Sequence, residues 1–133
     1  MEDLGVFIDS YIQKLSRKYG VKKPMWLFVN YDVLRVPAYI WPYGSGPGQG
    51  FIAFPERPLR RAWEKDPELA KRALEHIIAH EFRHYMQHLR YGNLMDYMPI
   101  FIRELGAHFF AVVETWTTLR WSVKTINNLV LDP

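Results

Sequence analysis

The chain of 133 residues contains no cysteine. This absence excludes disulfides, iron–sulfur clusters, thiolate zinc sites and cysteine nucleophiles, so any metal ion must be bound by histidine, aspartate or glutamate. No apolar run approaches the ~18 residues that a membrane-spanning helix needs. The acidic start Met-Glu-Asp-Leu lacks the positively charged segment of a signal peptide. We therefore expect a cytoplasmic protein that does not insert into a membrane.

The chain also has little excess charge of either sign. Seventeen lysines and arginines face fourteen aspartates and glutamates, which gives a formal net charge of +3. This mild basic excess is not typical of nucleic-acid-binding domains. The basic residues between positions 14 and 23 and between 57 and 61 are interpreted as solvated surface, in a helix and a loop respectively. Nucleic acid remains an alternative partner, and these basic residues are its only support in the sequence.

The hydrophobic content is high enough for a folded core. Hydrophobic residues make up 49% of the chain and aromatic residues 16%, which excludes a disordered or low-complexity segment. The length is close to the usual size of one domain. We expect residues 1–133 to form a single catalytic domain.

The first half of the chain predicts one helix and a small sheet. Apolar residues recur at three- and four-residue steps from Leu4 to Leu15, and Gly20 is a plausible helix end. Runs rich in β-branched and aromatic residues follow Pro24 and predict strands. The expected strands are 25–29, 33–36, 38–41 and 51–54, with a turn at 30–32 and a glycine-rich loop at 42–50.

The second half predicts two long helices. Asp66 is a good N-cap and Pro67 fits the first helical position. The apolar periodicity then continues to Tyr91-Gly92-Asn93, and a second helix is expected to begin around 96–99 and to run through Trp116 or beyond. The fold class is therefore α+β: an N-terminal backing helix, a small sheet of three to four strands, and two long helices.

The pattern His80-Glu81-Phe82-Arg83-His84 lies in the middle of the first long helix. Residues four apart on a helix are neighbours on one face, so two imidazoles at this spacing can bind the same ion. Glu81 flanks the ion without needing to bind it. This arrangement is typical of a metalloprotease, which needs two histidine ligands and a general base. His76 and His88 extend the series at the same spacing but drift off the ligand face, and we expect His88 to be exposed to solvent.

A third protein ligand is needed for a catalytic zinc site, and the second long helix offers candidates. Glu104 follows His84 by twenty positions, which leaves room for a turn and an antiparallel return. Glu104 and His108 are again four apart, and the small residues Gly106 and Ala107 between them allow two helices to approach closely.

These two segments resemble the gluzincin metallopeptidases, whose third ligand is a glutamate in a helix that reads Glu-x-x-Ala-Asp. The short chain is similar to the minigluzincins, which are minimal soluble members built on the catalytic core of integral-membrane zinc proteases. The resemblance covers residues 77–111. It implies a zincin-like fold, with the histidines on an active-site helix and the glutamate on the next helix.

The resemblance also implies residue roles. His80, His84 and Glu104 match the zinc ligands, Glu81 matches the general base, and Ala107 matches the small residue of the glutamate motif. His108 stands where the family has an acid that orients a ligand histidine. A neutral imidazole could accept that hydrogen bond or could itself bind the metal.

The expected activity is hydrolysis of peptide bonds in a peptide or protein substrate, with one Zn²⁺ per chain. The metal activates a water molecule, and Glu81 removes its proton and later delivers it to the leaving amine. A tyrosine or histidine is expected to stabilise the oxyanion, and the candidates are His108, Tyr97, Tyr91 and His88. The strand Phe51, Ile52, Ala53, Phe54 resembles the zincin edge strand that pairs with an extended substrate.

Two other functional classes remain open. The zincin-like site could be catalytically silent and serve metal binding or nucleic-acid-associated regulation. Alternatively, His108 could complete a closed structural metal site. The enzyme could also be latent, with Asp132 of the C-terminal segment 127–133 capping the metal. The oligomeric state is not predicted.

Overall fold

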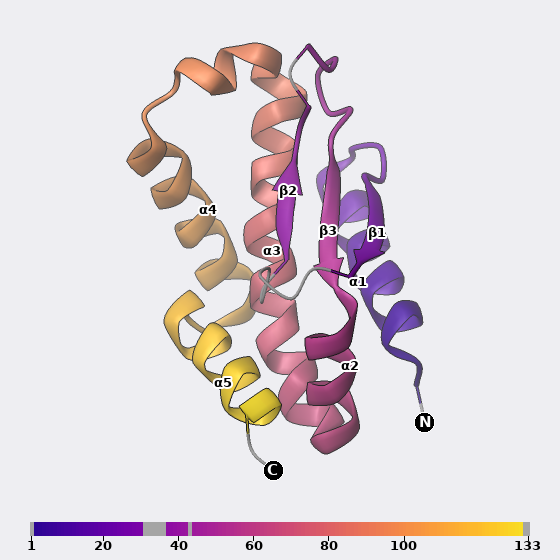
Figure 1. Cartoon of the computed structure of the whole chain (residues 1–133). Helices are drawn as coiled ribbons and strands as arrows, with labels where there is room; N and C mark the ends of the chain where they lie inside the picture. Colours follow the sequence, from indigo (N-terminus) through magenta and orange to yellow (C-terminus); the bar gives the residue numbers. More distant parts are fainter. Residues whose placement is uncertain (1, 31–36, 43, 132–133) are drawn as a thin grey trace.

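Five α-helices and a three-stranded sheet make up the part of the chain that the computed structural model describes, residues 2–30, 37–42 and 44–131 (Figure 1). This confirms the α+β class. The strand predicted over 33–36 and most of the turn before it fall outside the described residues. The elements are α1 Leu4–Tyr19, β1 Met25–Val29, β2 Ala38–Ile40, β3 Phe51–Pro55, α2 Glu56–Lys65, α3 Pro67–Tyr91, the 3-10 helix η1 Gly92–Tyr97, α4 Ile100–Thr115 and α5 Leu119–Leu131.

The N-terminal helix α1 forms as its sequence predicts. The Asp3 carboxylate accepts hydrogen bonds from the backbone N–H groups of Gly5 and Val6 at 2.9 and 3.3 Å, which is a standard N-cap. Gly20 ends the helix in the left-handed conformation, with φ of 63°. The apolar stripe from Leu4 to Leu15 is buried against the rest of the core.

The sheet has the order β1-β3-β2. β3 pairs in parallel with β1, Met25 opposite Phe51, and antiparallel with β2, Ile40 opposite Phe51. The central strand is therefore β3, and Ile52, Ala53 and Phe54 on it are buried. β2 lies beside α3 (Figure 1).

Helix α2 was not predicted, because the arginines at 57, 60 and 61 were interpreted as a loop. The structure corrects this. Leu59, Ala62 and Trp63 at three- and four-residue steps are buried, while Arg57 and Arg61 are exposed. Only three residues of this helix are buried, and they form a narrow apolar stripe among many charged residues. Prolines at 55 and 58 made a helix in this segment harder to predict.

The long helix α3 contacts every other helix and two strands of the sheet. The Asp66 carboxylate accepts the N–H of Leu69 at 3.1 Å, Pro67 occupies the first turn, and the helix ends at Gly92. All of these features were predicted. Figure 1 shows α4 and α5 on one side of α3, with the sheet and α1 on the other.

The C-terminal region forms two helices. The sequence predicted one helix that runs through Trp116 or beyond. α4 begins after Pro99, within the predicted range, and ends at Trp116, which adopts a left-handed conformation with φ of 56°. Thr118 then accepts the N–H of Trp121 through its hydroxyl group and starts α5. None of the helices described, in 2–30, 37–42 and 44–131, is long and apolar enough to cross a membrane.

The buried face of α2 gives a test of this fold. We expect Leu59→Ala to lower the free energy of unfolding by about 3 kcal/mol, because Leu59 is fully buried and the substitution leaves a cavity. Arg57→Ala, an exposed position on the same helix, is expected to change it by less than about 0.5 kcal/mol. Denaturant unfolding measures both, and equally small effects at the two positions would show that residues 56–65 do not pack as a helix.

Candidate metal centre

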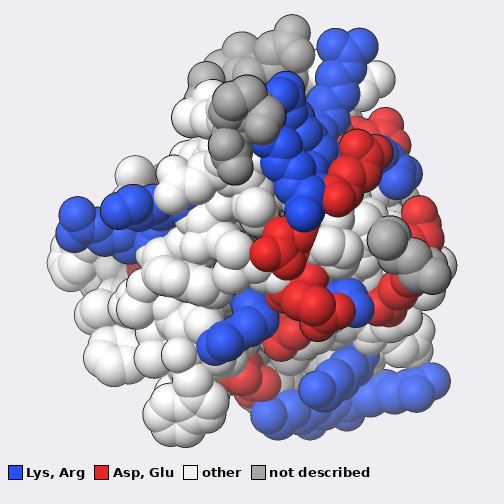
Figure 2. Space-filling view, turned by 90° about the horizontal axis from the view of Figure 1, so that it is seen from below, with Lys and Arg blue, Asp and Glu red and all other residues white. Residues whose placement is uncertain are grey.

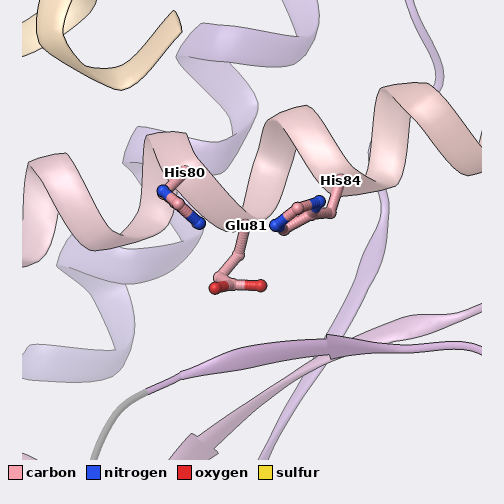
Figure 3. Close-up of side chains that lie close together, drawn as sticks. All are labelled: His80, Glu81 and His84. Carbon is pink, nitrogen blue, oxygen red and sulfur yellow. The ribbon is translucent and has the colours of Figure 1, made fainter. Parts of the chain in front are cut away.

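Three side chains on α3 form a compact group at the middle of the helix. His80 and His84 are buried, with their ring centroids 5.0 Å apart, and Glu81 lies between them. Each of the three offers one ligand atom within 4.8 Å of the other two, so the group could hold a metal ion. Figure 3 shows the carboxylate of Glu81 between the two rings, directed toward the strands. The four-residue spacing on a continuous helix produces this arrangement.

Glu104 on α4 reaches the same two histidines. Its carboxylate oxygens lie 2.9 Å from His80 Nε2 and 3.1 Å from His84 Nε2, and the side chain is half exposed. The helices approach closely here because the inner face of α4 consists of small residues: Ala107 is buried, and a Cβ on Gly106 would lie 3.1 Å from the Gln87 amide nitrogen. The structure thus brings together the four residues that the sequence singled out.

The environment favours neutral imidazole and raises the proton affinity of Glu81. Burial, together with the nearby His84, lowers the pKa of His80, and the Glu104 carboxylate only partly opposes this effect. Withdrawal from water raises the pKa of Glu81 to about 8. The hydrogen bond from the Tyr39 N–H opposes this increase, whereas the nearby Glu104 carboxylate adds to it. A neutral imidazole has the free lone pair that a metal ligand requires.

Gln87 orients His84, and sequence reasoning missed this residue. The Gln87 side-chain oxygen lies 3.0 Å from His84 Nδ1, and the Gln87 amide donates to the backbone oxygen of Arg103 at 3.2 Å. An amide oxygen only accepts, so Nδ1 of His84 donates to it and Nε2 is directed toward Glu104. The signal was available, since Gln87 lies three positions after His84 on one helix face.

Strand β2 forms the wall of the site opposite α3. The backbone N–H of Tyr39 donates to the Glu81 carboxylate at 2.8 Å. A cleft of about 370 Å³ opens between these elements. Its lining includes the four residues above and continues with Pro37, Ala38, Tyr39, Trp41, Ile77, Arg103, Leu119 and Val123.

The strand predicted to meet a substrate, Phe51, Ile52, Ala53 and Phe54, does not line this cleft. The prediction is wrong because β3 is the central strand: residues 51–53 pair with β2 on one side and with β1 on the other. The strand at the site is β2, which is short and follows Pro37. Its Tyr39 faces Glu81 with a backbone N–H that β3 does not use.

The predicted oxyanion candidates lie away from the cleft. Tyr97 is 85% exposed and Tyr91 is 41% exposed, and neither lines the cleft. His108 lies with its ring 6.4 Å from that of His76 and is outside the group of ligand atoms found among the described residues. Asp132, the proposed cap of a latent enzyme, lies outside the part of the chain that the structure describes.

His88 is buried, which corrects the expectation that it is exposed to solvent. Its Nδ1 lies 2.7 Å from the Tyr39 hydroxyl group and accepts the Gly48 N–H at 3.1 Å. The Tyr39 hydroxyl also accepts the N–H of Gly50 at 3.0 Å. His88 therefore holds the glycine loop and β2 against α3, and it supports the wall of the cleft without lining it.

Comparison of the chain with protein-family models, with curated proteins and with solved structures gives no match. The resemblance to gluzincins therefore depends on the residues of α3 and α4 alone.

The donor set fits a metal ion that prefers nitrogen and oxygen ligands. Two ligands that lie ~2.0 Å from a tetrahedral zinc ion are roughly 3.3 Å apart. The observed distances from Glu104 to the two Nε2 atoms, 2.9 and 3.1 Å, are only slightly shorter. The contacts of Glu104 with the two histidines are therefore within a few tenths of an ångström of the spacing expected between ligands of such an ion.

The role of Gln87 can be tested by metal binding. We expect Gln87→Leu to raise the dissociation constant for Zn²⁺ about 10- to 100-fold, because His84 loses the acceptor that fixes its ring. Competition with a chromophoric chelator measures this. Gln87→Glu keeps an acceptor oxygen but loses the hydrogen bond to Arg103, and we expect it to bind no more weakly than wild type. An equal loss in both variants would contradict the orienting role.

Proposed function

We propose that this protein is a zinc-dependent peptidase with Glu81 as general base and acid. The observation that supports the proposal is the convergence of His80 Nε2, His84 Nε2 and the Glu104 carboxylate next to a second carboxylate, Glu81, in one cleft. Three protein ligands leave a fourth position for water, as catalytic zinc sites require. Zinc bound there would lower the pKa of water and polarise the scissile carbonyl group.

Glu81 is suited to carry a proton between two reacting groups. Its pKa of about 8 without a metal shows that its site does not stabilise the charged form by itself. A cation held by the neighbouring histidines would favour the carboxylate and bring this pKa down. The Tyr39 N–H holds one oxygen of Glu81 at 2.8 Å and leaves the other to accept a proton from water and return it to the leaving amine.

The walls of the cleft can accommodate an extended peptide. Ile77, Leu119 and Val123 are apolar lining residues that can contact substrate side chains. The guanidinium group of Arg103 lies 5.4 Å from the centroid of the Trp41 ring, and Arg103 is the only lysine or arginine in the described lining. We therefore propose Arg103, in place of the tyrosines and histidines considered from the sequence, as the side chain that faces negative charge developing on the substrate.

Replacement of Glu81 tests the proposal. We expect Glu81→Gln to retain Zn²⁺ and to lower the rate of cleavage of an unstructured protein by about 10²- to 10⁴-fold, because the base is removed while size and ligands are kept. Zinc content by mass spectrometry of metals and cleavage by gel assay are the two measurements. Glu68→Gln, at an exposed position on the same helix, is the matched control and should cleave like wild type.

The other outcomes separate the alternatives. Binding of zinc by wild type and variant with cleavage by neither would favour a catalytically silent metal-binding protein. Absence of zinc from both would overturn the assignment of a metal site. Equal cleavage by wild type and Glu81→Gln would overturn the role of Glu81.

A further inference from the structure

Helix α4 presents a continuous apolar face to solvent. Phe101, Leu105, Phe109 and Val113 follow one another at four-residue steps and are 71%, 54%, 63% and 64% exposed. We call these four residues the α4 stripe. Residues at this spacing are neighbours on the helix surface. The opposite face, with Ala107 and Ala111 as the only fully buried residues of α4, packs on α3.

The exposed area is large enough for a stable protein interface. α4 also carries two exposed apolar side chains at its ends, Ile100 at its first position and Trp116 directly after its last. Aromatic side chains contribute roughly 150–250 Å² each, so the stripe and these two residues expose on the order of 700 Å². The largest apolar patch of a typical monomer is about 300–600 Å², whereas each partner in a standard interface buries about 800 Å².

The charged residues of α4 all point elsewhere. Glu104 meets the two histidines, Glu114 pairs with Lys18 and Tyr19, and Arg103 lies over Trp41. Figure 2 shows the molecule from below, with most acidic side chains gathered on the right and a largely white left half that also carries Lys and Arg side chains. Helices that bind anionic membranes carry several lysines and arginines beside the apolar face, whereas α4 has a single one, Arg103, which lies over Trp41. The surface fits an uncharged protein face.

We propose that the α4 stripe is the interface of a homodimer, in which two copies of α4 pack antiparallel. The two-fold axis crosses the exposed face of α4 at the level of Ala107. This register places Phe101 opposite Val113 of the partner subunit and Leu105 opposite Phe109 of the partner subunit. Each large ring thus faces a smaller aliphatic side chain, which close packing favours. A parallel pairing would set each phenylalanine against its own copy. The antiparallel face is self-complementary, as a two-fold interface must be.

The proposal is independent of the proposed peptidase activity. The residues that α4 contributes to the cleft, Arg103 and Glu104, are not members of the stripe. Each subunit therefore keeps a complete cleft in the dimer.

The mass in solution tests the interface. We expect light scattering after size-exclusion chromatography of the full chain to give twice the chain mass of 15.8 kDa. Phe109→Glu should shift the mass to that of one chain, with circular dichroism unchanged. Val6→Glu places the same charge at a 56% exposed position on α1 and should leave the dimer intact. A monomeric wild type or a dimeric Phe109→Glu variant would overturn the proposal. Sedimentation of a monomeric wild type with phosphatidylcholine vesicles would instead assign the α4 stripe to a lipid surface.

The arrangement can be tested separately because the chain has no cysteine of its own. In the antiparallel dimer the two copies of residue 105 are close to the two-fold axis, whereas the two copies of residue 100 are separated by roughly 20 Å along the direction of the helices. We expect Leu105→Cys to be crosslinked efficiently by a short bifunctional maleimide and Ile100→Cys to give little product. Equal crosslinking at both positions would overturn the antiparallel register.

Discussion

The carboxylate of Glu104 lies against the Nε2 atoms of His80 and His84, and this contact joins the helix of the histidines to the helix of the acid. The side-chain oxygen of Gln87 fixes the hydrogen of His84 on Nδ1. Nε2 then faces a carboxylate oxygen, and this contact is favourable when a proton or a metal cation lies between the two atoms. The second carboxylate, Glu81, increases this demand for positive charge. The geometry of the cluster could therefore hold a cation.

The cluster also explains the composition of α4. A carboxylate can reach two imidazoles on a neighbouring helix only when the two backbones are close, and Gly106, Ala107 and Ala111 provide that distance. Phe110 packs inward against Phe82 and Tyr19, whereas the other large apolar residues of α4 are exposed. A helix that is apolar on its outer face as well is normally covered by another surface.

The sequence predicted the features that depend on local patterns. The cap Asp66, the end of α1 at Gly20 and the position of the histidine pair follow from rules that involve residues a few positions apart. The α+β class is confirmed, and Glu104 does reach the histidines, although its role as a ligand stays a prediction. The order of the strands could not be read from local pattern, so Phe51–Phe54 was wrongly placed at an edge. His88 was wrongly expected in solvent, because its partners Tyr39 and Gly48 are forty or more positions away.

The proposed metal centre and the proposed interface use neighbouring residues of the same helix, so the position of α4 affects both. The buried anchors of α4, Ala107 and Ala111, are small side chains that contribute little apolar burial. α4 is also held by Phe110, which packs against Phe82 and Tyr19, and by Glu114, which pairs with Lys18. In the proposed metal centre, a cation bound between the helices would hold α4 more firmly and lower the entropic cost of docking a second copy. By thermodynamic linkage, dimerisation must then strengthen metal binding by the same factor.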